Sequence, residues 1–208
     1  ENVLDVGCGT GAWCLEMAAE NPQTNVVGVD LLPLYPTDVR PDNCRFVQAD
    51  VLQGLPFADE SFDFVHMRDL GVGVPADAWA KLMGELLRVT KPGGRVEICD
   101  SDMVPRGVGQ AGRLLAKWTH AALSVHGIDP TSVRGLPRLM QDAGFEEVRM
   151  HLRDFKDGIH AGEMGRASAA MQLGVYRALS PFVARALCMD ELAFERNLMA
   201  YERELETM

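Results

Sequence analysis

The sequence has no cysteine pattern of the kind that builds metal or disulfide sites. Its five cysteines are odd in number, include no Cys-x-x-Cys pair, and form no spacing with histidine that suggests zinc. We therefore expect no metal, reduced thiols and an intracellular protein, either cytoplasmic or, if its role is regulatory, nuclear. The cysteines are Cys8, Cys14, Cys44, Cys99 and Cys188.

Long apolar runs and basic residues are also scarce. No stretch approaches the roughly 20 apolar residues that cross a bilayer, and no signal peptide precedes the first predicted strand. Because the sequence opens inside that strand, we expect native N-terminal residues to be missing from it. Twenty Lys and Arg stand against 30 Asp and Glu, giving a formal net charge of −10. This balance argues against a broad nucleic-acid or anionic-membrane surface and favours a small or cationic partner.

The chain length predicts one domain. The 208 residues are 47% hydrophobic, which is enough for one well-buried core and rather little for two. No internal repeat or low-complexity segment marks a boundary. We predict a single domain over residues 1–208, with residues 1–100 forming its cofactor-binding half.

The first eleven residues predict a ligand-binding loop. Val3, Leu4 and Val6 form a short apolar strand, glycines follow at positions 7, 9 and 11, and a helix is predicted over residues 12–21. A strand, a glycine loop and a helix together direct backbone N–H groups at one small cavity. No Gly-Lys-Ser/Thr follows, which excludes a phosphate-binding NTPase loop. The spacing of Gly7, Gly9 and Ala12 also fits a dinucleotide fold.

Acidic residues follow three predicted strands in succession. Asp5 lies at the end of the first, Asp30 ends the run 26–30, and Asp50 follows the run 44–48. Parallel strands collect such residues at one edge of the sheet. Asp5 would repel a pyrophosphate but suits a ligand with ammonium and sulfonium groups. Asp30 has the spacing of an acid that binds ribose hydroxyls.

The remaining pattern predicts a doubly wound α/β fold with a mostly parallel sheet. Strands are predicted over 62–67 and 95–100, with a helix over 75–91 that ends at Lys91-Pro-Gly-Gly94. A helical stripe contains Leu114, Trp118, Ala122 and Val125, and another runs from Val133 to Gly144. Apolar residues alternate with charged ones over 145–152, which predicts a sixth strand there. Residues 154–208 read as helices only, so no seventh strand is evident; the clearest stripe contains Phe194, Leu198, Tyr201 and Leu205.

Three runs of sequence carry a family resemblance. Residues 3–11, 61–68 and 87–94 resemble class I S-adenosylmethionine (SAM) dependent methyltransferases, in particular the fungal methyltransferases related to the secondary-metabolism regulator LaeA. The resemblance implies a Rossmann-like fold, SAM as the cofactor, and an adenine amino group bound by Asp50. The implied cofactor-binding residues are Asp5, Gly7, Cys8, Gly9, Gly11, Trp13, Asp30, Leu31, Asp50, Val51 and Met67.

Methyl transfer from a sulfonium is a direct displacement, so the protein chiefly aligns the reactants and excludes water. A general base helps only when the nucleophile arrives with a proton. His66 lies at the carboxyl end of the predicted fourth strand and Asp69 follows that strand; both are candidates for that role, although a structural histidine is the commoner case.

Two function classes remain open from sequence. One is an enzyme that methylates O, N or S of a small, secondary-metabolite-like acceptor; the other is a regulatory module that acts through a protein partner or as a homodimer. A dinucleotide oxidoreductase would leave Asp5, Gly11 and Asp50 without a role. We expect residues 101–130 and 154–208 to form a helical lid that selects the acceptor. Its candidate residues are Met103, Trp118, His126, Met164, Met171, Tyr176 and Phe182.

Overall fold

The computed structural model describes residues 1–154, 158 and 160–208, which form two compact units. The first unit contains residues 1–101 and 133–149, and the second contains residues 102–132 and 150–208. A single domain closed by a helical lid stays a prediction. None of the described helices is long and apolar enough to cross a membrane.

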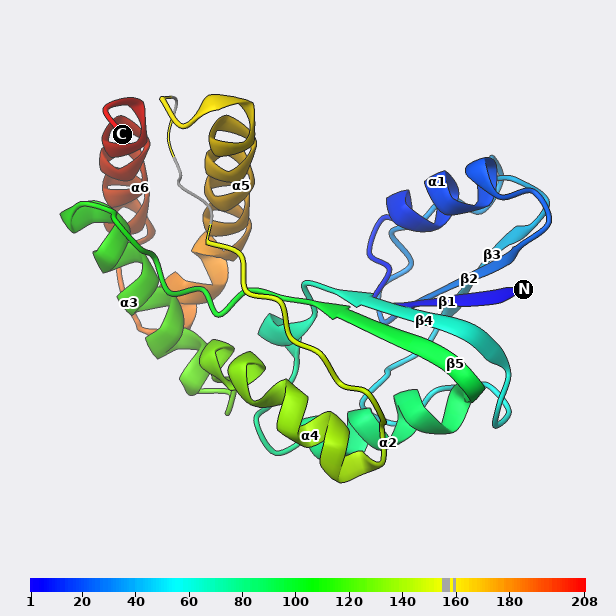
Figure 1. Cartoon of the computed structure of the whole chain (residues 1–208). Coiled ribbons are helices and arrows are strands. Elements are labelled where there is room, and N and C mark those ends of the chain that lie inside the picture. The colour runs from blue at the N-terminus through cyan, green and yellow to red at the C-terminus, as the bar shows by residue number, and fades with distance from the viewer. Residues whose placement is uncertain (155–157, 159) are drawn as a thin grey trace. The chain divides into compact units, whose positions relative to one another are not determined.

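The first unit is a five-stranded parallel sheet in the order β3-β2-β1-β4-β5, as the alternating pattern predicted. Helix α1 covers one face of this sheet, and α2 and α4 cover the other (Figure 1). Its elements are β1 (Asn2–Val6), α1 (Ala12–Glu20), β2 (Asn25–Asp30), β3 (Cys44–Gln48), β4 (Phe62–Arg68), the 3-10 turn η1 (Gly71–Gly73), α2 (Trp79–Val89), β5 (Thr90–Cys99) and α4 (Leu136–Ala143).

Two apolar clusters fix the faces of the sheet. Alternate residues of the central strands, such as Leu4 and Val65, pack with Leu82 and Leu86 of α2. On the opposite face Val3 packs with residues of α1. Burial of both faces explains why the central strands read as continuous apolar runs. This arrangement holds the carboxyl ends of β1, β2 and β4 side by side.

The second unit is helical. The 3-10 turn η2 (Pro130–Gly135) leads back from it to α4. The helices α3 (Gln110–Ser124), α5 (Gly162–Ala186) and α6 (Glu191–Glu206) pack on one another around a second core. The predicted stripe of α6 is confirmed, because Phe194, Leu198, Tyr201 and Leu205 are all buried.

The predicted sixth strand is wrong. The described residues of 145–152 contain no strand, Glu147 has a left-handed φ of 49°, and Leu152 is 79% exposed. Alternation alone does not make a strand when one residue leaves the extended region and no neighbour supplies hydrogen bonds.

Two boundaries also differ from the sequence prediction. Residues 91–94 belong to the start of β5 and form an irregularity against β4, although proline and glycine suggested the end of a helix there. The buried face of α3 contains Ala122 of the predicted stripe, but otherwise Leu115, Thr119 and Leu123, whereas Val125 of the stripe is 63% exposed.

Candidate cofactor site at the carboxyl ends of the strands

The glycine loop is held against the end of β2. The N–H groups of Gly7 and Cys8 both donate to the Val29 carbonyl oxygen, at 2.8 and 3.0 Å. The Gly11 N–H donates to the Cys8 carbonyl oxygen at 2.9 Å, and α1 begins at the next residue. The loop is therefore a turn held in place by backbone hydrogen bonds, and α1 starts directly after it.

The three glycines differ in what surrounds them, although all have positive φ. A Cβ at Gly7 would lie 2.8 Å from the Leu70 side chain, and one at Gly11 would lie 2.5 Å from Phe46. A Cβ at Gly9 would meet no atom within 4 Å. Gly9 is thus the point where bare backbone faces open space, as close approach of a ligand requires.

A cavity of about 210 Å³ lies at this loop. It brings together seven of the predicted site residues and three, Thr10, Ala12 and Arg68, that the sequence argument missed. Arg68 could have been found from the alternation of β4, which places it on the face of Phe64 and His66. The lining residues are Asp5, Gly7, Cys8, Gly9, Thr10, Ala12, Trp13, His66, Arg68 and Asp69.

Asp5 and His66 form a buried pair at the cavity. They are register partners on β1 and β4, and His66 Nδ1 lies 2.8 Å from Asp5 Oδ1. The two residues are 3% and 4% exposed. A carboxylate only accepts hydrogen bonds, so with Asp5 ionised the Nδ1 atom carries the proton. Nε2 is left without a partner among the described residues.

Trp13 and Cys14 complete this cluster from the first turn of α1. The Trp13 ring stacks on the His66 ring with centroids 4.0 Å apart and planes 8° apart. The Cys14 Sγ donates to Asp5 Oδ2 at 3.3 Å. A hydrogen bond with Cys8, burial and the Asp5 charge raise the pKa of Cys14, so its thiol stays protonated as a donor. Both Asp5 oxygens therefore already have protein partners.

Asp30 and Asp50 lie at strand ends as expected but do not line the cavity. Asp30 Oδ2 accepts the Gly9 N–H at 2.8 Å, and its Oδ1 accepts the Leu32 N–H at 2.9 Å. Asp50 Oδ1 accepts the Leu52 N–H at 2.9 Å. Asp30 thus acts directly on the backbone of the glycine loop.

Four other predicted cofactor residues also lie outside the cavity lining. Leu31 is 57% exposed after β2, and Gly11 packs near Phe46. The side chains of Val51 and Met67 belong to the core on the α2 face.

The segment after β4 is anchored to the end of β5. Asp69 has a φ of 55°, and its N–H donates to the Cys99 carbonyl oxygen at 3.0 Å. Asp100 accepts the N–H groups of Gly71 and Ser101 at 2.7 and 2.8 Å. Burial raises the pKa of Asp100. These bonds fix where Arg68 and Asp69 reach the cavity.

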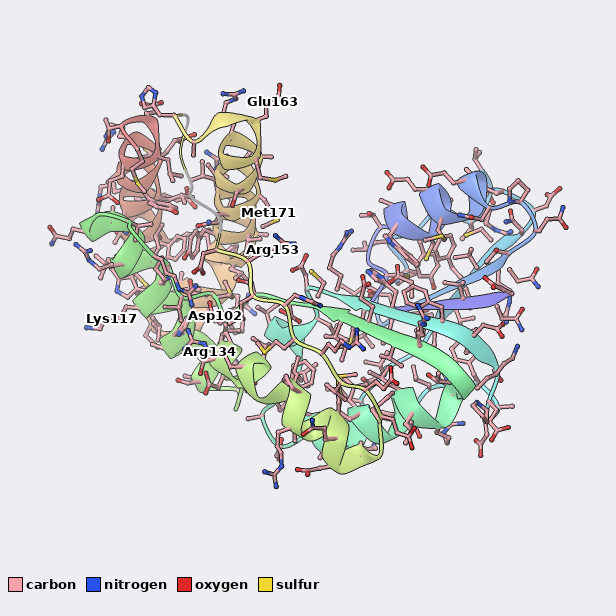
Figure 2. The ribbon with its side chains drawn as sticks, in the orientation of Figure 1. Asp102, Lys117, Arg134, Arg153, Glu163 and Met171 are labelled. Carbon is pink, nitrogen blue, oxygen red and sulfur yellow. The ribbon has the colours of Figure 1, made fainter. Side chains whose placement is uncertain are left out.

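The predicted lid residues lie in the second unit. Tyr176 is buried there, and the rings of Trp118 and Phe182 pack on Phe194 and His126 with centroids 6.0 and 5.2 Å apart. Met171 projects from α5 and is 57% exposed (Figure 2). Met164 is 64% exposed, and His126 is exposed as well. Met103 is half-buried, and its carbonyl oxygen lies 3.0 Å from His120 Nε2.

Residues 3–94 match the family model of a methyltransferase domain. The chain carries a class I methyltransferase domain and resembles LaeA. It is 32% identical over 152 residues to the secondary metabolism regulator laeA of Aspergillus niger, and equally to the protein-methionine methyltransferase laeA of Emericella nidulans. Each match covers 70% of this chain and 40% of the relative, so the chain spans less than half the length of these relatives.

The fold agrees with solved methyltransferases. The structure of CalO1, a methyltransferase of calicheamicin biosynthesis, superposes with a TM-score of 0.53 at 21% identity, covering 71% of this chain and 44% of that one. The family supports SAM as the cofactor, and this chain offers what SAM needs: an open cradle at Gly9, acidic groups for a cationic ligand, and a helix that starts at the loop.

Proposed function

We propose that this chain transfers the methyl group of SAM to an O, N or S nucleophile of a small, secondary-metabolite-like acceptor by direct displacement. The observation that carries this proposal is the cavity at Gly9, where bare backbone faces open space and Asp5 and Asp69 belong to the same lining. A site with acidic groups suits a cofactor that carries an ammonium group and a sulfonium.

The chain's own residues then hold and align the reactants. Bound SAM supplies a methyl group already activated by the positive sulfur. Asp30 fixes the glycine loop through the Gly9 N–H and keeps its remaining lone pairs for ribose hydroxyls. Asp50 is held for the adenine amino group by its bond to the Leu52 N–H. Alignment of this kind can account for much of a displacement barrier.

His66 is our candidate for the general base. Asp5 accepts a hydrogen bond from Nδ1–H, which leaves Nε2 to accept a proton from an acceptor hydroxyl, thiol or ammonium group. Trp13 holds the ring by stacking. Asp69, exposed at the cavity, is the second candidate.

A second candidate function is methylation of methionine in a protein. It is favoured by the identity of 32% with the protein-methionine methyltransferase of Emericella nidulans. A regulatory module of this kind would act through protein partners. A thioether has no proton to lose, so this reaction needs no base.

The cofactor assignment is tested at Asp30. Asp30→Ala should weaken SAM binding by about 1.5–3 kcal/mol, the range for a hydrogen bond to a charged group. Asp38→Ala is the matched control, because Asp38 lies exposed in the following loop and, among the described residues, its side chain accepts a hydrogen bond only from the Thr37 hydroxyl. Titration calorimetry that gives both variants wild-type affinity would remove Asp30 from the site.

The acceptor class is tested by product release. Formation of S-adenosylhomocysteine is measured with phenols, thiols and amines in one series and with a methionine-containing peptide in another. Turnover with the first series supports the small-molecule enzyme. Turnover confined to the peptide supports the regulatory alternative.

A further inference from the structure

Arg68 is a cation without a described partner at the cofactor cavity. It ends β4 and is exposed, and no hydrogen bond or ion pair joins it to any described residue. Among the residues that line the cavity, all of them described, it is the only one with a guanidinium or ammonium group. Other basic side chains of the first unit, such as Arg88 and Lys91, are paired with carboxylates.

The strand places Arg68 at the cavity. Val65 and Met67 point into the core on the α2 face, so Phe64, His66 and Arg68 share the α1 face, where the glycine loop lies. The following residue is anchored to β5, which fixes the backbone just beyond Arg68.

The cavity therefore presents both signs of charge within about 210 Å³. Asp69 supplies an exposed carboxylate, Asp5 supplies a buried one whose oxygens already bond His66 and Cys14, and Arg68 supplies a planar fork of N–H donors. The first turn of α1 adds free N–H groups and the positive end of the helix dipole on the same side as Gly9. A ligand that carries an ammonium group and a carboxylate on one carbon matches this arrangement.

We infer that Arg68 binds the α-carboxylate at the amino-acid end of the cofactor. The inference rests on the proposed function and assigns a residue that neither the glycine loop nor the strand-end acids include. A guanidinium pairs with a carboxylate through two parallel hydrogen bonds, which gives strength and orientation together. Arg68 is thus a specificity residue that distinguishes SAM from analogues without the carboxylate.

The experiment compares two ligands on four proteins. Titration calorimetry measures binding of SAM and of decarboxylated SAM to the wild type, to Arg68→Gln, to Arg68→Lys and to Arg45→Gln. Arg45 is the matched control, because it is an exposed arginine on β3 that lines a separate cavity without Gly9. Thermal melts of all four proteins should coincide, since Arg68 forms no hydrogen bond or ion pair with a described residue.

Arg68→Gln should weaken the binding of SAM by about 10- to 100-fold and leave the affinity for decarboxylated SAM unchanged. Arg68→Lys should keep part of the SAM affinity, because it retains the charge and loses the fork. Arg45→Gln should bind both ligands as the wild type does.

Three results would overturn the inference. Equal losses of affinity for SAM and for decarboxylated SAM would show that Arg68 does not bind the carboxylate. Unchanged SAM affinity with a raised KM for an acidic acceptor would assign Arg68 to the acceptor instead. A wild-type protein that binds neither ligand would reject the proposed function itself, which separates that failure from the other two.

Discussion

The buried pair of Asp5 and His66 allows a quantitative prediction. Removing either partner leaves a buried polar group of the other without the hydrogen bond between them, since the two residues are 3% and 4% exposed. The variants are Asp5→Ala, His66→Phe and the double variant. Phenylalanine keeps an aromatic ring against Trp13, whose ring centroid lies 4.0 Å from that of His66.

The magnitude follows from burial and hydrogen bonding. His66→Phe leaves Asp5 with only the Cys14 thiol as a side-chain partner, at 3.3 Å. Loss of a hydrogen-bond partner by a buried polar group costs about 1–3 kcal/mol, and more when the group left behind is charged, as the Asp5 carboxylate is in His66→Phe. The double variant should lose less than the sum, with a coupling free energy of about 1–3 kcal/mol. If His66 is the base, turnover of His66→Phe should also fall by about 100-fold.

The assay must report on the first unit alone, because two units need not unfold together. Trp13 and Trp79 lie in this unit and Trp118 lies in the second. Urea unfolding followed by tryptophan fluorescence in a Trp118→Phe background therefore isolates it. A second double-mutant cycle serves as the control. It uses the surface pair Arg138 and Asp142, which lie 3.0 Å apart and whose side chains are 80% and 57% exposed.

The control pair should couple by at most about 0.5 kcal/mol, as exposed pairs four residues apart on a helix do. A coupling between Asp5 and His66 no larger than this would refute the reasoning. Asp5 would then not orient His66, and the case for His66 as a base would lose its structural support.

Two further predictions concern stability and substrate choice. Hydrogen bonds from Arg88 lower the pKa of Glu85 to about 2 from an ordinary 4.5, so its contribution is full above about pH 4.5 and is lost as the pH falls toward 2. Glu85→Gln should lower the unfolding free energy by about 1–2 kcal/mol at pH 7, and urea curves at pH 2 should coincide with those of the wild type. If the helices of the second unit select the acceptor, Met171→Ala should change acceptor preference in a turnover assay at constant SAM affinity. The control is Met199→Ala, because Met199 is also an exposed methionine but lies on α6. Equal effects of the two substitutions would reject a specific role for Met171.

The sequence predicted the parts of the site that local patterns encode. The glycine spacing and the strand-end position of Asp30 follow from short-range rules, because the turn needs positive φ and the carboxyl ends of parallel strands share an edge. The long-range contacts were not predictable in this way. No pattern shows that the first turn of α1 returns Cys14 to Asp5, since that contact depends on how the helix packs on the sheet.

Arg68 shows why a charged residue at a strand end is hard to interpret from one sequence. The alternation of β4 places Arg68 on the face of His66, but an arginine at the end of a strand is also the ordinary pattern of a solvent-exposed terminus. The failed strand over 145–152 is the converse case. There the alternation was clear, but the left-handed Glu147 and the exposure of Leu152 break it.

The two candidate functions diverge at His66. A phenol, thiol or ammonium acceptor must lose a proton, so a ring nitrogen directed by Asp5 has a chemical task in that reaction. A methionine thioether has no proton to give, and the same pair would then serve only to join β1 to β4 and support Trp13. Both reactions need the open backbone at Gly9, because both begin from the same cofactor. Loss of turnover without loss of SAM binding in His66→Phe therefore points to a protic acceptor, and unchanged turnover points to a thioether.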